Sequence, residues 1–213
     1  ARTSLDGVEK AENLSGSVLM IGFGRFGQVA SQALLARGLD VSIIDHDVEM
    51  IRSAAGFGFK VYYGDGTRVD VLHASGAHRA RAIAVCVDDA TISNRIVELV
   101  RREFPQARLL VRAIDRQHAL ELMAHDVDYQ VREVYESATS FGEAALRLLG
   151  VGEQEAAEIA ADLRRRDRER IELQFTGGLN AGVDLLHSNR LKPRPLTTPR
   201  QAGSALSEET AAV

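Results

Sequence analysis

Residues 18–27 read Val-Leu-Met-Ile-Gly-Phe-Gly-Arg-Phe-Gly, and they are the strongest indication of the fold class in this sequence. Four consecutive apolar residues that end in glycine are typical of a strand buried on both faces of a parallel sheet. The glycines form a G-x-G-x-x-G motif, and apolar residues then recur at helical spacing from Arg25 to Arg37. This order of strand, turn and helix predicts a nucleotide-binding unit in which the first-turn amides of the helix face a phosphate.

Each position of the motif has its own expected role. Gly22 permits the tight turn, Gly24 lets the backbone approach a phosphate, and Gly27 lets the helix and the strand pack closely. The residues between the glycines, Phe23, Arg25 and Phe26, belong to the same predicted cofactor site. The alternative is a glycine-rich turn that binds nothing, and the end of the next strand argues against it.

Asp45 ends the second predicted strand, 18 residues after Gly27. A carboxylate about 20 residues beyond such a motif hydrogen-bonds the adenosine ribose, and it repels a 2′-phosphate. NAD(H) or a plain adenine nucleotide such as AMP is therefore favoured over NADP. His46 either caps the following helix or touches the ligand.

Two further strands end in polar residues. Gly64-Asp65-Gly66-Thr67 follows the third strand, and Asp88-Asp89 follows the fourth. Because the carboxyl ends of parallel strands line the ligand crevice of an open α/β sheet, we expect Asp65, Gly66, Thr67 and Asp88 in the site. Capping of the next helix is the alternative role for these side chains.

Apolar runs alternate with helical patterns along most of the chain. The predicted strands are 18–21, 41–44, 60–63, 82–87, 109–113 and 128–131, and the helices between them are 25–37, 48–55, 69–75, 89–104 and 117–124. Strands and helices in alternation, joined by short loops, predict an α/β fold with a doubly wound, Rossmann-like parallel sheet.

The pattern changes beyond Val134. Apolar spacing predicts one helix up to Gly150 and a second from Glu153 to about Arg170, followed by a short strand at Ile171–Phe175. We divide the chain into a linker at 1–16, a nucleotide-binding domain at 17–133, a helical dimerisation and regulatory extension at 134–175, and a disordered tail at 176–213. The linker would lead back to an upstream segment.

Composition excludes several function classes. In 213 residues, 26 Lys and Arg face 30 Asp and Glu, so the net charge of −4 does not favour nucleic-acid binding. The single cysteine, Cys86, excludes an intrachain disulfide and a Cys-rich zinc site, and the histidines lack the spacing of a zinc enzyme. No metal is expected.

The sequence shows no recognisable set of catalytic residues. A nicotinamide-dependent dehydrogenase needs a proton donor or acceptor near the hydride position, and the sequence shows no candidate. We therefore predict a regulatory ligand-binding domain that is not an enzyme, with no catalytic residues. The alternative is an NAD-dependent oxidoreductase whose substrate region is the C-terminal helices.

Several motifs in order resemble one family. Gly22–Gln28, Asp45-His46-Asp47, Tyr63–Arg68 and Arg132-Glu133 are similar to the KTN (RCK, TrkA-N) domain of Kef-type glutathione-gated potassium efflux systems, over roughly residues 15–170. The resemblance implies a homodimeric, nucleotide-binding regulator of potassium/proton antiport that responds to glutathione and its adducts. It also implies a membrane antiporter domain in the same polypeptide, a place on the cytoplasmic face of the bacterial inner membrane, and an ancillary flavoprotein oxidoreductase as partner.

The resemblance also assigns regulatory residues. Phe57 matches an aromatic residue associated with glutathione adducts, and Arg132 matches an arginine that meets glutathione at the dimer interface, where Arg168 would close over the ligand. The chain departs from the family at Gln32, where an Arg is usual, and at residues 165–168, which read Arg-Arg-Asp-Arg where a glutathione-binding Asn is usual. The alternative role for Arg132 is a salt bridge with a nearby acid such as Glu133 or Glu136.

Overall fold

The computed structural model describes residues 18–188. The predicted linker at 1–16 and most of the predicted tail, residues 189–213, lie outside them. Within residues 18–188 no helix combines the length and the apolar character needed to cross a lipid bilayer.

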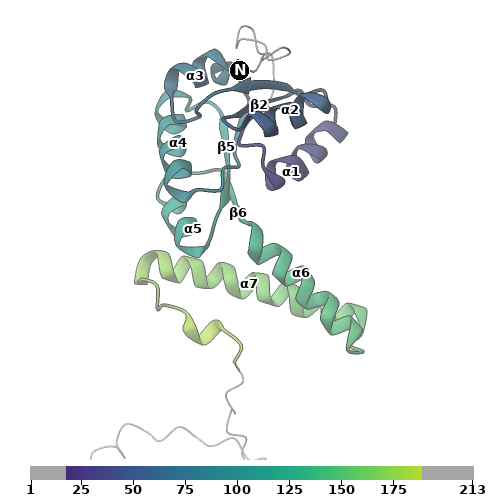
Figure 1. The fold of residues 1–213 in the computed structure, drawn as a ribbon. Coiled ribbons are helices and arrows are strands. Elements are labelled where there is room, and N and C mark those ends of the chain that lie inside the picture. The colour runs from purple at the N-terminus through teal and green to yellow at the C-terminus, as the bar shows by residue number, and fades with distance from the viewer. Residues whose placement is uncertain (1–17, 189–213) are drawn as a thin grey trace, which may run out of the picture.

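The predicted doubly wound sheet is confirmed (Figure 1). Six parallel strands lie in the order β3-β2-β1-β4-β5-β6, so the two halves of the sheet diverge from β1 and β4. The strands are β1 (Val18–Ile21), β2 (Val41–Asp45), β3 (Lys60–Tyr63), β4 (Ala82–Val85), β5 (Arg108–Ala113) and β6 (Tyr129–Arg132). The reversal between β1 and β4 is where such sheets leave a crevice.

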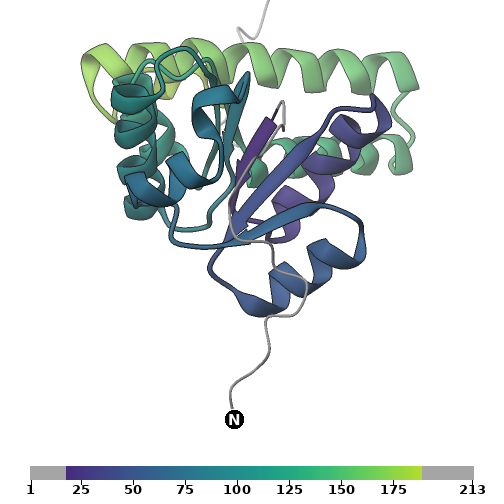
Figure 2. The same ribbon diagram turned by 90° about the horizontal axis from the view of Figure 1, so that it is seen from above.

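Helices cover both faces of the sheet (Figure 2). They are α1 (Arg25–Ala36), α2 (Val48–Gly56), α3 (Val69–Ala74), α4 (Ala90–Glu103) and α5 (Arg116–Met123), with a 3-10 helix η1 (Ala77–Arg79). Because strand side chains alternate, Val18 and Met20 pack with α1 and α2, whereas Leu19 and Ile21 pack with α3, α4 and α5. All four are buried, which accounts for the continuous apolar run.

Two long helices follow the sheet. α6 (Glu133–Leu148) and α7 (Glu153–Gly177) pack against each other as a hairpin that projects from the sheet domain, and α7 also packs on α5 (Figure 1). The predicted strand at Ile171–Phe175 is wrong, because these residues continue α7. Ile171 packs on the core and Gln174 is buried, so these two residues, three positions apart, lie on the face of α7 that contacts the domain. Leu173 and Phe175 stay half exposed.

The described part of the predicted tail is also different from the expectation. Residues 176 and 177 belong to α7, and a 3-10 helix η2 (Val183–Leu185) follows it. The Gln174 side chain donates a hydrogen bond to the Leu179 carbonyl oxygen, and η2 packs back against α7. These contacts hold residues 178–186 along the helix, which composition alone did not indicate.

Candidate functional site

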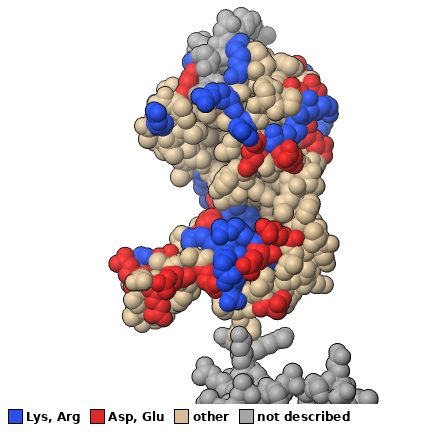
Figure 3. All heavy atoms as spheres, turned by 180° about the vertical axis from the view of Figure 1, so that it is seen from behind, with Lys and Arg blue, Asp and Glu red and all other residues tan. Residues whose placement is uncertain are grey.

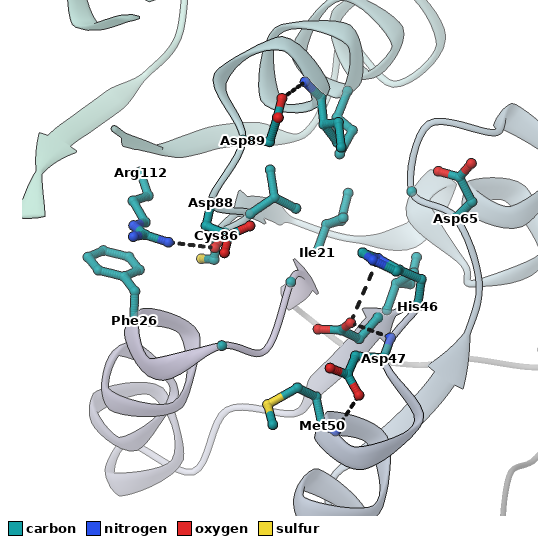
Figure 4. A pocket seen from close by; sticks show the side chains of 18 of the residues that line it. Ile21, Phe26, His46, Asp47, Met50, Asp65, Cys86, Asp88, Asp89 and Arg112 are labelled. Atoms are coloured by element: carbon teal, nitrogen blue, oxygen red, sulfur yellow. Dashed lines mark hydrogen bonds and ion pairs between the residues drawn. The ribbon is translucent and has the colours of Figure 1, made fainter. Parts of the chain in front are cut away.

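A cavity of about 610 Å³ opens at the carboxyl ends of β1, β2, β3 and β4. Most of the predicted cofactor residues line it: Gly22, Gly24, Arg25, Phe26, Asp45, His46, Asp65, Gly66 and Asp88. Figure 4 shows His46, Asp47, Met50 and Asp65 on one side of this pocket, and Phe26, Cys86, Asp88 and Arg112 on the other. The tertiary structure therefore brings strand ends far apart in sequence to one place.

Three predicted residues do not line the pocket: Phe23, Gly27 and Thr67. The Phe23 ring is buried and packs edge-on against Phe59, with 5.1 Å between ring centroids, so it belongs to the core. Gly27 faces the glycine turn, since a Cβ there would lie 2.6 Å from the Gly22 carbonyl oxygen. Phe23 and Gly27 therefore support the glycine turn without lining the pocket.

The glycine turn leaves donors free at the start of α1. Gly22 has φ +93° and donates its N–H to the Ile44 carbonyl oxygen at 2.9 Å, which joins the turn to β2. Gly24 is the N-cap residue of α1, and no side chain caps this helix. The first-turn N–H groups therefore face the pocket side of the motif without a side-chain acceptor, an arrangement that favours an anion.

Asp45 ties this turn to the end of β2. Its Oδ2 accepts the Phe23 N–H at 2.7 Å and its Oδ1 accepts the Asp47 N–H at 2.8 Å, and the side chain is only 9% exposed. The His46 Nδ1 atom lies 4.0 Å from the same carboxylate, with its ring exposed. Asp47, not His46, caps α2, so the capping role considered for His46 is wrong.

Asp65 is held in place by the next loop residue. Its Oδ1 accepts the Thr67 N–H at 2.8 Å and the Thr67 hydroxyl at 2.7 Å, and these bonds lower the pKa of Asp65 below its ordinary value. Because Arg68 is the N-cap residue of α3 and makes no side-chain cap bond, the capping alternative for Asp65 and Thr67 is wrong. Thr67 thus supports the pocket indirectly, by orienting a carboxylate that lines it.

Sequence reasoning missed several residues that line the pocket: Met50, Cys86, Ile92, Ile96, Arg112 and Glu133. Arg112 follows the apolar residues 109–111 of β5 and lies near its carboxyl end, so the rule that selected Asp65 and Asp88 also applies to it. Burial raises the pKa of the Cys86 thiol to about 12, which keeps it protonated at neutral pH and unsuited to act as a nucleophile.

A second cavity, of about 260 Å³, lies between β6, the start of α6 and α7. The predicted regulatory residues Arg132 and Arg168 both line it, whereas Phe57 lies outside both cavities as an exposed residue at the end of α2. Figure 3 shows basic side chains gathered where α7 meets the sheet domain, with acidic ones toward the tip of the hairpin.

Arg132 forms an ion pair with an acidic residue of α7. Its guanidinium pairs with Asp167 of α7, which also binds Arg116, and it stacks over Tyr135 at 4.3 Å from the ring centroid. The alternative role, a salt bridge with an acid of the chain, is thus confirmed for Arg132, but the acid is Asp167, because Glu133 pairs with Arg112 and Glu136 with Arg164. Within residues 18–188, Arg168 makes no hydrogen bond or ion pair, so it is a free cation at this cavity.

The described residues contain no group of three or more His, Cys, Asp or Glu side chains placed to share a metal ion.

The buried His118 has a structural role. Its Nδ1 accepts the Ile114 N–H at 3.1 Å and its Nε2 lies 3.1 Å from the Asn94 side-chain oxygen, so the neutral ring completes both bonds. Burial accordingly lowers the pKa of His118.

Comparison with known proteins gives three results. Residues 18–133 match the TrkA-N domain family. A glutathione-regulated potassium-efflux system protein of Haemophilus influenzae is 40% identical over 198 residues, which are 93% of this chain and 32% of that protein. The protein KefC of Cronobacter sakazakii, also named as glutathione-regulated, is 42% identical over 148 residues, 70% of this chain and 24% of its own length. This chain therefore spans between a quarter and a third of these relatives.

A solved structure agrees in fold and sequence. The Kef CTD of Shewanella denitrificans in its AMP bound form is 35% identical and superposes with a TM-score of 0.69. The match covers 74% of this chain and 96% of that one. The similarity thus extends over nearly the whole of that domain.

Proposed function

This chain belongs to the TrkA-N domain family, and on that premise we propose that it is the nucleotide-binding regulatory domain of a Kef-type potassium efflux system. It would gate potassium/proton antiport in response to glutathione and glutathione adducts. Since the relatives are much longer, the membrane antiporter part would lie in the same polypeptide, with this domain on the cytoplasmic face of the bacterial inner membrane. The ancillary flavoprotein stays a prediction from the resemblance.

One observation carries the nucleotide assignment. The free first-turn amides of α1 and the Asp45 carboxylate lie in one pocket, at the spacing that serves the phosphate and the ribose of an adenine nucleotide. The related Kef CTD was solved with AMP, which makes AMP the first ligand to test, and NAD(H) the second. If the chain were instead an oxidoreductase, it would oxidise NADH steadily with a carbonyl or quinone substrate. The relatives of this chain are named as potassium-efflux system proteins, which favours the regulatory function.

We expect the chain to bind AMP and the Asp45→Asn variant to bind it about ten-fold more weakly, because a neutral amide is a poorer acceptor for ribose hydroxyls. Calorimetric titration measures both affinities. Asp47→Asn is the matched control, since it removes a charge from the same pocket and Asn keeps the cap of α2. Equal AMP affinity in wild type and Asp45→Asn would contradict the assignment, as would tighter binding of NADPH than of NADH.

The exposed face of α6 supports the homodimer. Val134, Phe141 and Leu148 are 70%, 78% and 89% exposed, and with Ala138 and Ala145 they recur at alternating steps of four and three residues. This spacing forms the apolar seam by which one helix packs against another. A second copy that presents the same seam across a two-fold axis would cover it.

Replacing Phe141 by alanine should weaken dimerisation about ten-fold, because the ring is the largest side chain of the seam. Sedimentation velocity over a concentration series measures the dissociation constant. Phe175→Ala is the control, because Phe175 is also exposed but lies on α7, away from the seam. A monomeric wild type, or an equal effect of both substitutions, would remove this interface from the proposal.

A further inference from the structure

Arg112 connects the nucleotide pocket to the first residue of α6. Its Nη2 lies 2.7 Å from Oε2 of Glu133, and its Nη1 lies 3.5 Å from the Cys86 carbonyl oxygen. Both Arg112 and Glu133 line the pocket, and the Arg112 side chain is 17% exposed. The guanidinium thus lies in the wall of the pocket with one carboxylate partner.

This guanidinium has donors to spare and lies where an anion is expected. Its Nε is buried without a hydrogen-bond partner, and its central carbon lies 5.5 Å from the centre of the Phe26 ring. Phe26 is the second residue of α1, so Arg112 lies beside the helix end whose N–H groups are free (Figure 4). A planar guanidinium binds phosphate oxygens through two parallel hydrogen bonds.

The charge of the pocket makes this cation important. Among the described residues, Arg25 and Arg112 are the arginines that line it, against six carboxylates: Asp45, Asp47, Asp65, Asp88, Asp89 and Glu133. A phosphate that enters this acidic pocket is repelled unless a cation compensates its charge. Arg112 offers that charge, and Glu133 competes for it.

Glu133, which competes with the phosphate for Arg112, belongs to the hairpin of α6 and α7. Glu133 begins α6, and the residue before it, Arg132, pairs with Asp167 of α7. We propose that Arg112 is shared between the nucleotide phosphate and Glu133, so that binding of a phosphorylated adenine nucleotide draws Arg112 away from the first turn of α6. This inference rests on the proposed function of the pocket. It adds the residue through which an occupied pocket acts on the dimerisation helix.

Competition has a measurable signature. Glu133→Gln should tighten AMP binding about three- to ten-fold, because the phosphate no longer competes with a carboxylate, and it should leave adenosine binding unchanged. In an Arg112→Gln background, AMP should bind about ten-fold more weakly and Glu133→Gln should have no further effect. Calorimetry on the 213-residue chain gives the AMP affinity of the wild type, the two single variants and the double variant, which together form a double-mutant cycle.

Two controls separate this effect from simpler ones. Glu136→Gln lies one turn along α6 and pairs with Arg164 outside the pocket, so it should not change AMP binding. Arg112→Lys keeps the charge but not the two-pronged geometry, and it should recover only part of the AMP affinity. The amide hydrogen-exchange rate in the first turn of α6 should rise when AMP binds to the wild-type chain. It should not rise when adenosine binds, and AMP should not raise it in Arg112→Gln.

The outcomes are distinguishable. If Glu133→Gln tightens AMP equally with and without Arg112, the effect is plain charge repulsion and the sharing is refuted. Unchanged AMP affinity in Arg112→Gln refutes it as well. If the wild-type chain binds neither AMP nor NADH, the proposed function itself fails, and this inference falls with it.

Discussion

Replacing Gly22 by alanine should lower the free energy of unfolding by about 3 kcal/mol. The backbone there has φ +93°, which an L side chain rarely adopts. A Cβ would also lie 2.9 Å from the Val87 nitrogen and 3.0 Å from the Cys86 carbonyl carbon. Because both neighbours are backbone atoms of the segment that directly follows β4, neither can move aside cheaply. A loss of this size should lower the melting temperature by about 6–12 °C.

The matched control is Gly24→Ala in the same motif. Gly24 has φ −65°, and an added Cβ would meet no heavy atom within 4 Å. We therefore expect a change in stability of no more than about 0.5 kcal/mol. The new methyl group would, however, occupy the place where a phosphate approaches the backbone, and AMP affinity should fall about ten-fold or more. Thermal unfolding with and without AMP measures both effects, and equal melting temperatures of the two variants would refute this division of roles.

Asp167→Ala should cost about 3 kcal/mol of stability, since it leaves Arg116 and Arg132 facing each other without a counter-ion. Asp167 and Arg132 are 12% and 13% exposed, and Arg116 is 22% exposed, so water replaces the lost carboxylate poorly. Burial lowers the pKa of the Arg132 guanidinium, and the Asp167 carboxylate opposes that shift. Urea unfolding measures the loss.

Asp162→Ala is the control on the same helix. Asp162 is 34% exposed and pairs with Arg165 and Arg166 on the surface of α7, so its loss should cost no more than about 1 kcal/mol. Equal losses for the two variants would show that the partly buried triad of Arg116, Arg132 and Asp167 contributes no more than a surface ion pair.

The Asp167 variant also tests whether the second cavity is the proposed glutathione site. Without Asp167, Arg132 would be free to bind an external carboxylate together with Arg168, which has no ion-pair partner among residues 18–188, and glutathione carries two carboxylates. Glutathione should therefore raise the melting temperature of Asp167→Ala more than that of the wild type. If neither protein responds, and Arg132→Ala also behaves as the wild type does, the second cavity is not the glutathione site.

The departure from the family at residues 165–168 gains a physical meaning from this triad. Asp167 already supplies Arg132 with a carboxylate from within the chain, so a ligand carboxylate must displace it or share its partner. Sequence comparison with the family marked the position but not its contact. The contact joins residues 35 positions apart, on β6 and α7.

The parallel sheet, the glycine turn and the place of Asp45 at the end of β2 could all be predicted from the amino-acid sequence. These depend on spacing between near neighbours: alternation along a strand, the helical repeat, and the freedom of glycine within a few residues. Short loops and right-handed crossovers then limit the order of the strands. The ligand roles of the predicted residues remain predictions.

The pairing of the charged groups could not be predicted, because it depends on contacts between distant parts of the chain. Arg112 and Glu133 lie 21 positions apart, and Arg116 and Asp167 lie 51 apart, so no local spacing indicates either pair. The same is true of Ile171–Phe175, where alternating apolar residues suggested a strand. Burial of Ile171 and Gln174 against the domain instead stabilises the helix, because the surface that a residue buries depends on neighbours that the chain brings together only on folding.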